Sequence, residues 1–226
     1  MTQQQHALPS GLPLRVDIVS DVVCPWCIIG YKQLMKALAS LPGQFDVTIH
    51  WHPFELNPLM PMAGQDLREH LTQKYGTTPG QSQGARARLS ALGESLGFTF
   101  DYFDGMRMVN TFNAHQLLHW AEEFGRQTAL KLALFEAFFS RREDVSDTLL
   151  LAEVAGRAGL DADQARAVLS DQRYAQAVRD EQQYWLDNEV HAVPTFYFQQ
   201  QYLVAGAQEA EAFVRLLQKI QSRANA

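Results

Sequence analysis

The two cysteines of the chain, Cys24 and Cys27, form a C-x-x-C pair that constrains the fold more than any other feature. The apolar run 14–19 before the pair is rich in β-branched residues and predicts a buried strand. A helix follows, because Pro25 is favoured in a first helical turn and apolar residues recur at helical spacing as far as Leu41. Cys24 therefore precedes the first turn, where free backbone N–H groups and the helix dipole are expected to stabilise its thiolate.

This spacing predicts thiol–disulfide exchange, because one helical turn brings the two sulfurs within bonding reach. We expect an exposed Cys24 to attack the substrate and Cys27 to resolve the mixed disulfide. The alternatives are half of a zinc site or a pair of inert thiols. Structural zinc needs four ligands, and neither a second C-x-x-C nor a paired-histidine motif follows at finger spacing. The prediction is a redox pair with no metal.

Length and charge narrow the class of protein. The 226 residues suit one large domain or a domain with an insertion. A net charge of −6 argues against nucleic acid as a partner, and no apolar run is long enough to predict a membrane partner. Residues 1–13 lack the basic start and apolar segment of a signal peptide, so we predict a disordered tail. A single cysteine pair and no signal peptide predict a cytoplasmic protein.

The rest of the chain predicts a sheet interrupted by many helices. Residues 45–52 alternate strictly between apolar and polar, which with the preceding strand and helix indicates a parallel βαβ unit. His50 and His52 share the polar face; a solvent-facing edge strand explains them better than a metal site. An extended segment, 53–58, follows. Helical spacing of apolar residues then predicts helices at 64–75, 82–96, 111–124, 127–141, 148–158, 162–170 and 172–188.

Strand patterns return only near the end of the chain, at 193–198 and 202–204, and predict a hairpin followed by a helix at 208–222. Pro194 begins the first of these strands, and the residues alone leave open a trans bond or a cis bond. Within the helical region, His115 and His119 lie one turn apart. Surface positions or the lining of a substrate groove explain them better than metal binding.

Together these motifs resemble the DsbA family of thioredoxin-fold oxidoreductases, and specifically its FrnE-like subfamily. The resemblance runs from about Leu14 to the end of the chain. It rests on Ser20-Asp21, Cys24-Pro25-Trp26-Cys27, Pro53-Phe54-Glu55-Leu56-Asn57-Pro58, Asn110-Thr111, Ala114-His115, Val193-Pro194-Thr195-Phe196 and Val204-Ala205-Gly206-Ala207-Gln208. It implies an α/β protein, a thioredoxin fold interrupted by a large all-helical insertion domain. Residues 14–62 and 189–226 would form the split thioredoxin-like domain, and 63–188 the insertion.

The resemblance also implies site residues beyond the cysteines. Pro194 would be a cis-proline of the catalytic site, and Val193 would present its backbone to substrate. The remaining substrate-side candidates are Pro25, Trp26, Phe54, Asn57, Asn110 and His115. One departure concerns the hairpin, where related chains usually carry an Asn-Gly turn and this chain has 199–201, all glutamine. We therefore predict a longer or looser loop there.

The predicted function is a thiol–disulfide oxidoreductase or isomerase acting on protein or small-thiol disulfides. It would need no cofactor, with glutathione as an optional co-substrate, and its partner would be a disulfide- or thiol-containing polypeptide or glutathione. One alternative is a glutathione-dependent enzyme resembling 2-hydroxychromene-2-carboxylate isomerase or the kappa glutathione transferases, which typically carry serine at the position of Cys24. Another is a peptide-binding module without turnover. Asp21, Glu55 or water would accept the proton of Cys27.

Overall fold

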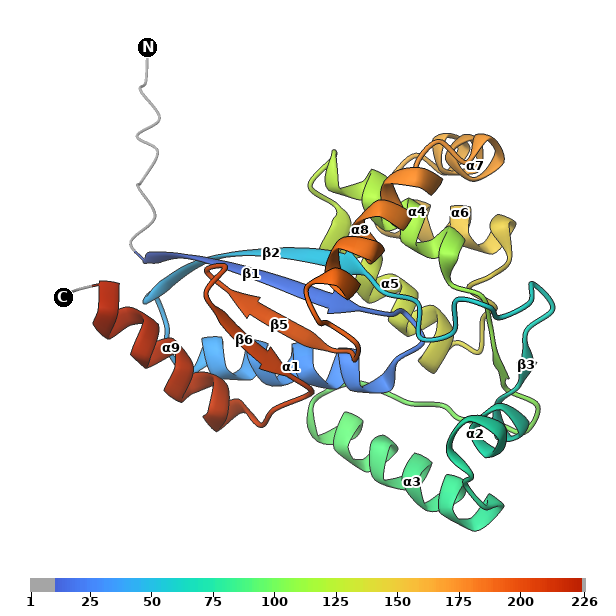
Figure 1. The fold of residues 1–226 in the computed structure, drawn as a ribbon, viewed down its shortest axis with the longest axis horizontal. Coiled ribbons are helices and arrows are strands. Elements are labelled where there is room, and N and C mark those ends of the chain that lie inside the picture. Colours follow the sequence, from blue (N-terminus) through green and yellow to red (C-terminus); the bar gives the residue numbers. More distant parts are fainter. Residues whose placement is uncertain (1–10, 225–226) are drawn as a thin grey trace.

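A four-stranded sheet in the order β2-β1-β5-β6 forms the centre of the computed structural model, which describes residues 11–224 (Figure 1). The strands are β1 (Leu12–Ser20), β2 (Phe45–Pro53), β5 (Thr195–Phe198) and β6 (Tyr202–Ala205). β1 and β2 run parallel and are joined by α1 (Pro25–Ala39), as the alternating and helical patterns predict. β5 and β6 form the predicted antiparallel hairpin, and β5 pairs with β1.

The two faces of the sheet are covered by different parts of the chain. α1 and α9 (Ala210–Ala224) pack together below the sheet in Figure 1, where the buried residues Phe196 and Phe198 contact Phe213 of α9. On the other face, Val19 of β1 packs against Trp185 of α8. Because successive strand residues point to opposite faces, β1 is buried on both sides, as expected for an inner strand.

The segment between β2 and β5 forms the insertion. Its helices are α2 (Leu67–Tyr75), α3 (Pro79–Ser95), α4 (Phe112–Glu122), α5 (Gln127–Ser140), α6 (Thr148–Arg157), α7 (Ala162–Asp171) and α8 (Ala175–Asp187). A small ribbon of β3 (Gln65–Asp66) and β4 (Arg107–Met108) accompanies them, so the insertion is not entirely helical. α2 begins later than predicted because Asp66 caps it, accepting hydrogen bonds from the N–H groups of Arg68 and Glu69.

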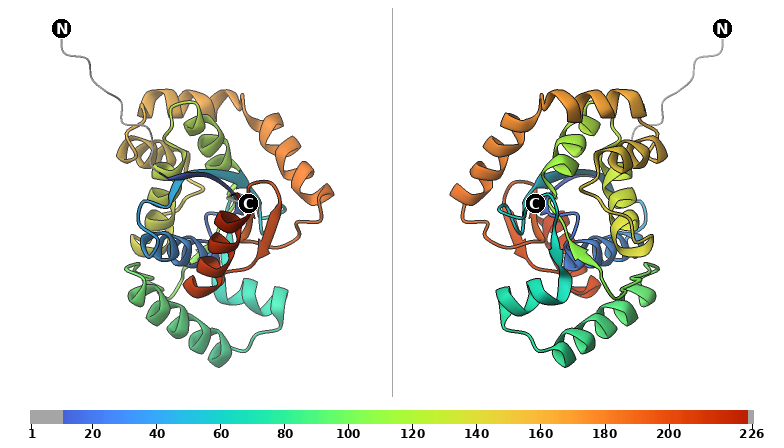
Figure 2. Two further views of the ribbon diagram at one scale, coloured as in Figure 1. Left: turned by 90° about the vertical axis from the view of Figure 1, so that its left-hand side faces the viewer. Right: turned by 90° about the vertical axis from the view of Figure 1, so that its right-hand side faces the viewer.

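The insertion surrounds one end of the sheet. Figure 2 shows α2 and α3 on one side of the sheet and α7 and α8 on the opposite side. α5 contacts β2 and α1 as well as α4 and α6, and its buried residues join those of β1 and α1 in one continuous apolar core. Among residues 11–224, no helix is long and apolar enough to cross a bilayer.

β2 lies at the edge of the sheet, as predicted, and Asp46 and Thr48 of its polar face are exposed, but the two histidines of that face are partly covered by helices of the insertion. His50 Nδ1 lies 3.1 Å from a carboxylate oxygen of Glu122 on α4. His52 lies between two carboxylates, 2.6 Å from Glu181 on α8 and 2.8 Å from Asp17 on β1. The alternating pattern correctly separates the two faces, but it cannot show which helices cover them.

Two predictions at the sheet's margins need correction. Of the predicted tail, residues 1–10 lie outside the described part of the chain, whereas residues 12 and 13 belong to β1, because Leu12 is aligned with Phe45 of β2. The hairpin loop is short rather than loose: Gln199 and Gln200 both adopt left-handed backbone conformations, with φ of 51° and 53°. The Gln199 side chain also donates to Pro13 O at 2.7 Å, which ties the turn to β1.

Candidate active site

The start of α1 holds the cysteine pair. Cys24 is the N-cap residue with an extended backbone, Pro25 occupies the first turn, and no acidic side chain lies in that turn. The Cys27 N–H donates to Cys24 O at 3.1 Å, which folds the C-x-x-C segment into one turn. Both thiols are free. Cys27 is fully buried, while Cys24 is only 3% exposed but lines a cavity, so Cys24 is the cysteine that a bound substrate can reach.

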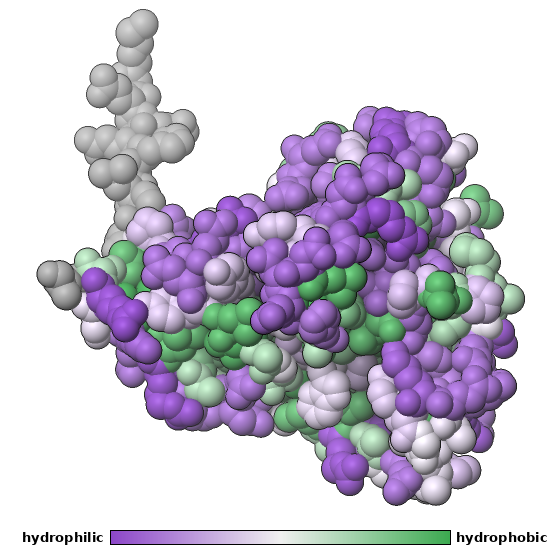
Figure 3. All heavy atoms as spheres, viewed as in Figure 1, coloured by the Kyte–Doolittle hydropathy of each residue, from purple (hydrophilic) through white to green (hydrophobic). Residues whose placement is uncertain are grey.

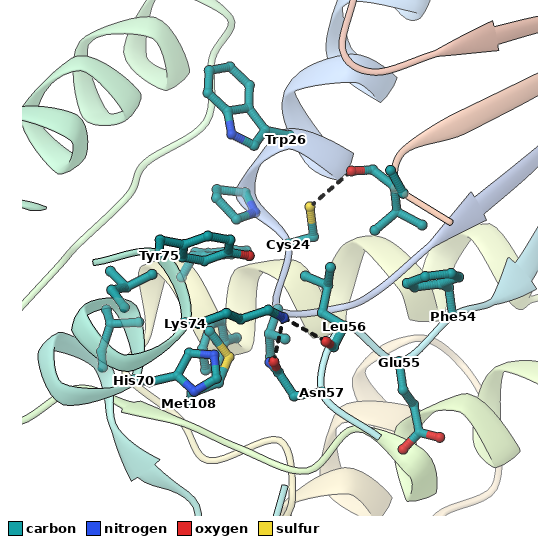
Figure 4. Close-up of a pocket in the computed structure, with 18 of the residues that line it drawn as sticks. Cys24, Trp26, Phe54, Glu55, Leu56, Asn57, His70, Lys74, Tyr75 and Met108 are labelled. Atoms are coloured by element: carbon teal, nitrogen blue, oxygen red, sulfur yellow. Dashed lines mark hydrogen bonds between the residues drawn. The ribbon is translucent and has the colours of Figure 1, made fainter. Parts of the chain in front are cut away.

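The loop before β5 faces this turn. The Val193–Pro194 peptide bond is cis, and Cys24 Sγ lies 3.7 Å from Val193 O, to which the thiol donates (Figure 4). Gly30 allows the close packing behind this contact. A Cβ atom at position 30 would lie 2.9 Å from the ring of Phe196 and 3.3 Å from Pro194. Glycine therefore lets α1 approach β5 closely enough to bring the loop to Cys24.

A cavity of about 700 Å³ opens beside Cys24. Five predicted site residues line it together with Cys24, namely Pro25, Trp26, Phe54, Asn57 and Val193. Most of the remaining wall comes from the insertion and is apolar, including Leu71, Leu89, Met106, Met108, Phe138 and Phe139. The space-filling view shows apolar side chains gathered between α8 and the α2–α3 region (Figure 3). The sequence-based prediction missed these wall residues, because their helical spacing is equally typical of core packing.

Two predicted residues lie elsewhere. Asn110 precedes α4 and connects two segments of the backbone. Its side chain accepts a hydrogen bond from Phe112 N at 3.0 Å and donates one to Met60 O at 2.9 Å. His115 is buried, with Nε2 3.3 Å from Asp21 Oδ1, and does not line the cavity. The expectation of a His115 facing solvent or substrate is therefore corrected. His119, by contrast, is partly exposed and pairs with Glu181.

A buried charged cluster lies behind the cysteines. Lys131 of α5 is 0% exposed, and its Nζ donates a hydrogen bond to Ser20 O at 3.3 Å. The same ammonium group lies over the aromatic rings of Trp51 and Phe135. Burial lowers the pKa of Lys131 to about 8, although the nearby cysteines and Asp21 favour its charge. The sequence-based prediction missed this residue. A lysine inside the otherwise apolar run 129–135 was the signal that could have found it.

Asp21 is the anion of this cluster. Its carboxylate accepts from Leu56 N at 2.8 Å and faces His115. Burial opposes its ionisation, but the contact with His115 outweighs burial, and the pKa of Asp21 lies below its ordinary value. Glu55, the other predicted proton acceptor, forms an ion pair with Arg179 and points away from Cys24 in Figure 4. Asp21 is therefore the carboxylate placed behind the cysteine pair.

The two thiols titrate as a coupled pair, and their surroundings shift the two pKa values in opposite directions. Burial disfavours the Cys27 thiolate, but a hydrogen bond from Cys24 and the positive charge of Lys131 place the pKa of Cys27 below its ordinary value. The hydrogen bond to Cys27 and burial raise the pKa of Cys24 well above its ordinary value. When the reduced pair has lost one proton, these directions favour the negative charge on Cys27, whereas the position of Cys24 at the helix N-terminus predicted a thiolate there.

The described residues contain no group of three or more His, Cys, Asp or Glu side chains arranged to hold a metal ion. The fold and the site together define a class: a thioredoxin-fold protein, with a C-x-x-C pair at a helix N-terminus facing a cis-proline loop. The family model of the DSBA-like thioredoxin domain matches residues 15–218, and the chain belongs to this family. This confirms the predicted family and fold.

Solved structures with the same fold include a probable DsbA oxidoreductase from Streptomyces coelicolor, with 37% identity and a TM-score of 0.86, covering 91% of this chain and 89% of that one. A 2-hydroxychromene-2-carboxylate isomerase shares 15% identity at a TM-score of 0.64, covering 92% and 95%. The cytosolic disulfide reductase DsbM from Pseudomonas aeruginosa, solved with glutathione, shares 17% identity at a TM-score of 0.58, covering 93% and 97%. The latter two show a likeness of fold alone.

Proposed function

We propose that the protein is a thiol–disulfide oxidoreductase that works through the C-P-W-C pair. The observation that carries this proposal is the placement of the two sulfurs. Cys24 lines the cavity opposite Val193, while Cys27 lies one turn deeper with no access to it. Of the two cysteines, Cys24 is therefore the one that a substrate disulfide can meet, and Cys27 is the one placed to resolve the mixed disulfide that results.

The exchange balances without a cofactor. Proton transfer from Cys24 to the Cys27 thiolate gives a Cys24 thiolate, which attacks one sulfur of the substrate disulfide and releases the other as a thiolate. Cys27 then loses this proton and attacks the Cys24 sulfur. The Cys24–Cys27 disulfide forms, and the second substrate thiolate leaves. Two electrons pass from the reduced pair to the substrate. The one remaining thiol proton passes to one product thiolate, and the other product thiolate is protonated by the solvent.

The buried cluster supports the second step. Lys131 supplies a positive charge that stabilises the Cys27 thiolate before it attacks. We propose Asp21 as the carboxylate that keeps Lys131 charged, since burial alone favours the neutral amine. The proton of Cys27 is then carried away by this cluster or by water.

Several finer assignments belong to this proposal. We propose that an extended polypeptide binds through the backbone of Val193, or that glutathione enters the same cavity. The glutathione proposal is supported by a structure of the same fold, DsbM, which was solved with glutathione. We also propose isomerase activity, membership of the FrnE-like subfamily and a cytoplasmic location, where a lone C-x-x-C pair cycles against the glutathione pool.

The test is a redox titration in glutathione buffers, with free thiols alkylated and counted by mass. We expect a single two-electron transition in the wild type. Cys24→Ser should abolish exchange, and Cys27→Ser should accumulate a mixed disulfide with glutathione or a client. If the Cys24→Ser variant exchanges disulfides at the wild-type rate, the mechanism is wrong.

The cavity favours one second candidate, a glutathione-dependent isomerase or transferase. A volume of about 700 Å³ is large enough for a small organic substrate beside a polarised thiol. Such an enzyme would need no resolving cysteine, so its turnover would survive Cys27→Ser. Turnover of a small electrophile by that variant, with no two-electron transition in the wild type, would favour this candidate.

A further inference from the structure

Two cationic side chains of the cavity wall have no carboxylate partner among residues 11–224. Lys74, at the end of α2, donates to two neutral groups, Leu56 O at 2.8 Å and Asn57 Oδ1 at 2.7 Å. Arg86, on α3, makes neither an ion pair nor a side-chain hydrogen bond within this part of the chain, although it lines the same cavity. Both positive charges are therefore available to a ligand.

The cavity has an excess of positive charge in a protein whose net charge is −6. Glu55 is the carboxylate among its lining residues, and it is already paired with Arg179. A bound anion would thus meet two cations and no free carboxylate. Such complementarity favours anionic ligands and repels cationic ones.

The rest of the wall determines the body of the ligand. Leucine, methionine and phenylalanine side chains of the insertion form most of the surface, and Tyr75 and Tyr102 add two aromatic rings. Figure 4 shows Lys74, Tyr75 and Cys24 around the same space. A ligand that fills this space buries an apolar body, places an anionic group near Lys74, and brings a sulfur to Cys24.

We propose that the preferred substrate is a small disulfide with an aromatic or branched apolar body and an anionic group that Lys74 and Arg86 bind. The proposal rests on the proposed function, because the substrate sulfur has to react with Cys24. The Cys24 thiolate attacks the disulfide R–S–S–R, forming Cys24–S–S–R and releasing R–S⁻. Cys27 then loses its proton and attacks the Cys24 sulfur, which releases the second R–S⁻. This proton neutralises one product, and the other is protonated by the solvent or stays ionised.

The experiment compares reduction rates of three disulfides by the full-length dithiol protein under stopped flow. The reagents are 5,5′-dithiobis(2-nitrobenzoate), which is aromatic and anionic, 4,4′-dithiodipyridine, which is aromatic and neutral, and cystamine, which is aliphatic and cationic. Each rate is expressed as the ratio of wild type to variant, which cancels the intrinsic reactivity of the reagent.

In the double variant Lys74→Gln with Arg86→Gln, we expect the anionic reagent to react about tenfold more slowly, because two charge-assisted contacts are lost. The neutral reagent should stay within about twofold, which separates ligand binding from a change in Cys24 reactivity. Cystamine should react faster with the double variant than with the wild type, because two positive charges that repel it are gone. The charge-preserving variant Lys74→Arg with Arg86→Lys should restore at least half of the lost rate with the anionic reagent.

Lys36→Gln with Arg215→Gln is the matched control. It removes the same net charge from a separate surface hollow, between α1 and α9, and should leave all three rates within about twofold. Equal slowing of the anionic reagent in the control and cavity variants would overturn the proposal, as would equal slowing of all three reagents in the cavity variant. Failure of the wild type to reduce any reagent would instead contradict the oxidoreductase function itself.

Discussion

Lys131 shows how a single buried charge tunes the cysteine pair. Within residues 11–224, its ammonium group has one hydrogen bond, to Ser20 O, and two aromatic rings lie beside it, so water does not screen its field. That field acts on Cys27 from behind, while Cys24 faces the cavity. The division of roles between the two thiols therefore depends on a residue more than a hundred positions away in sequence.

Replacing Lys131 with methionine should raise the pKa at which the pair first ionises by about one unit, because the neutral side chain no longer stabilises the thiolate. Iodoacetamide alkylation followed over pH 5–10 measures this midpoint. At pH 7 the rate should fall about tenfold. Lys36→Met, at the far end of α1, is the control and should leave the midpoint in place. A folded Lys131→Met protein with the wild-type midpoint would contradict this role.

At the scale of elements, His52 joins strand β2 to strand β1 and helix α8. Burial lowers the pKa of His52, but its hydrogen bonds to Asp17 and Glu181 outweigh burial and raise it overall. Burial raises the pKa of both carboxylates, but other contacts outweigh it: His52 and Arg15 lower the pKa of Asp17 to about 2, and His119 and His52 lower that of Glu181 to about 2. Three segments far apart in sequence are thus held together by groups whose charges depend on pH.

The raised histidine pKa predicts a loss of stability in alkali. A histidine whose pKa is higher in the folded than in the unfolded protein stabilises the folded state fully when the pH is below the unfolded pKa, about 6.5. This stabilisation is lost as the pH rises through the pKa of the folded state. The depressed carboxylates act oppositely: their contribution is present above about 4.5 and lost as pH falls towards 2. The His52 contacts should therefore stabilise the protein most between about pH 5 and 6.5.

Urea unfolding at pH 6 and 8 tests this expectation. The wild type should lose about 1 kcal/mol of the free energy of unfolding between these values through His52, and His52→Gln should remove most of that difference. His191→Gln, on an exposed loop, should retain the wild-type dependence. An unchanged pH dependence in His52→Gln would show that the contacts do not titrate in this range.

The elements themselves were largely predictable, whereas their contacts were not. The strand, the C-x-x-C turn and the first helix follow from local patterns, and so do most helices of the insertion. Local patterns failed where distant segments decide the outcome. Buried His115 faces Asp21 of the distant turn between β1 and α1, and Gln199 keeps a left-handed backbone in a tight turn because its side chain bonds to β1.

At the scale of the whole molecule, α5 connects the insertion to the thioredoxin-like part. Its buried residues Leu134 and Phe135 belong to the same apolar core as β1 and α1, and the helix also packs on α4 and α6. The buried charged cluster behind the cysteines depends on this arrangement, because Lys131 lies on the same helix. An insertion that shares a core and this buried cluster with the sheet cannot behave as an independent domain.

We therefore expect both parts to unfold in one transition, although the chain exceeds the usual two-state size. Trp51 in β2 and Trp120 in α4 are both buried, and variants retaining one or the other report on each part. Their fluorescence midpoints in urea should coincide. Leu134→Ala should cost about 2–5 kcal/mol and shift both midpoints equally, because the cavity it creates lies in the shared core. If only the Trp120 midpoint moved, the insertion would be unfolding separately, and the positive charge at Lys131 would be lost before the sheet unfolds.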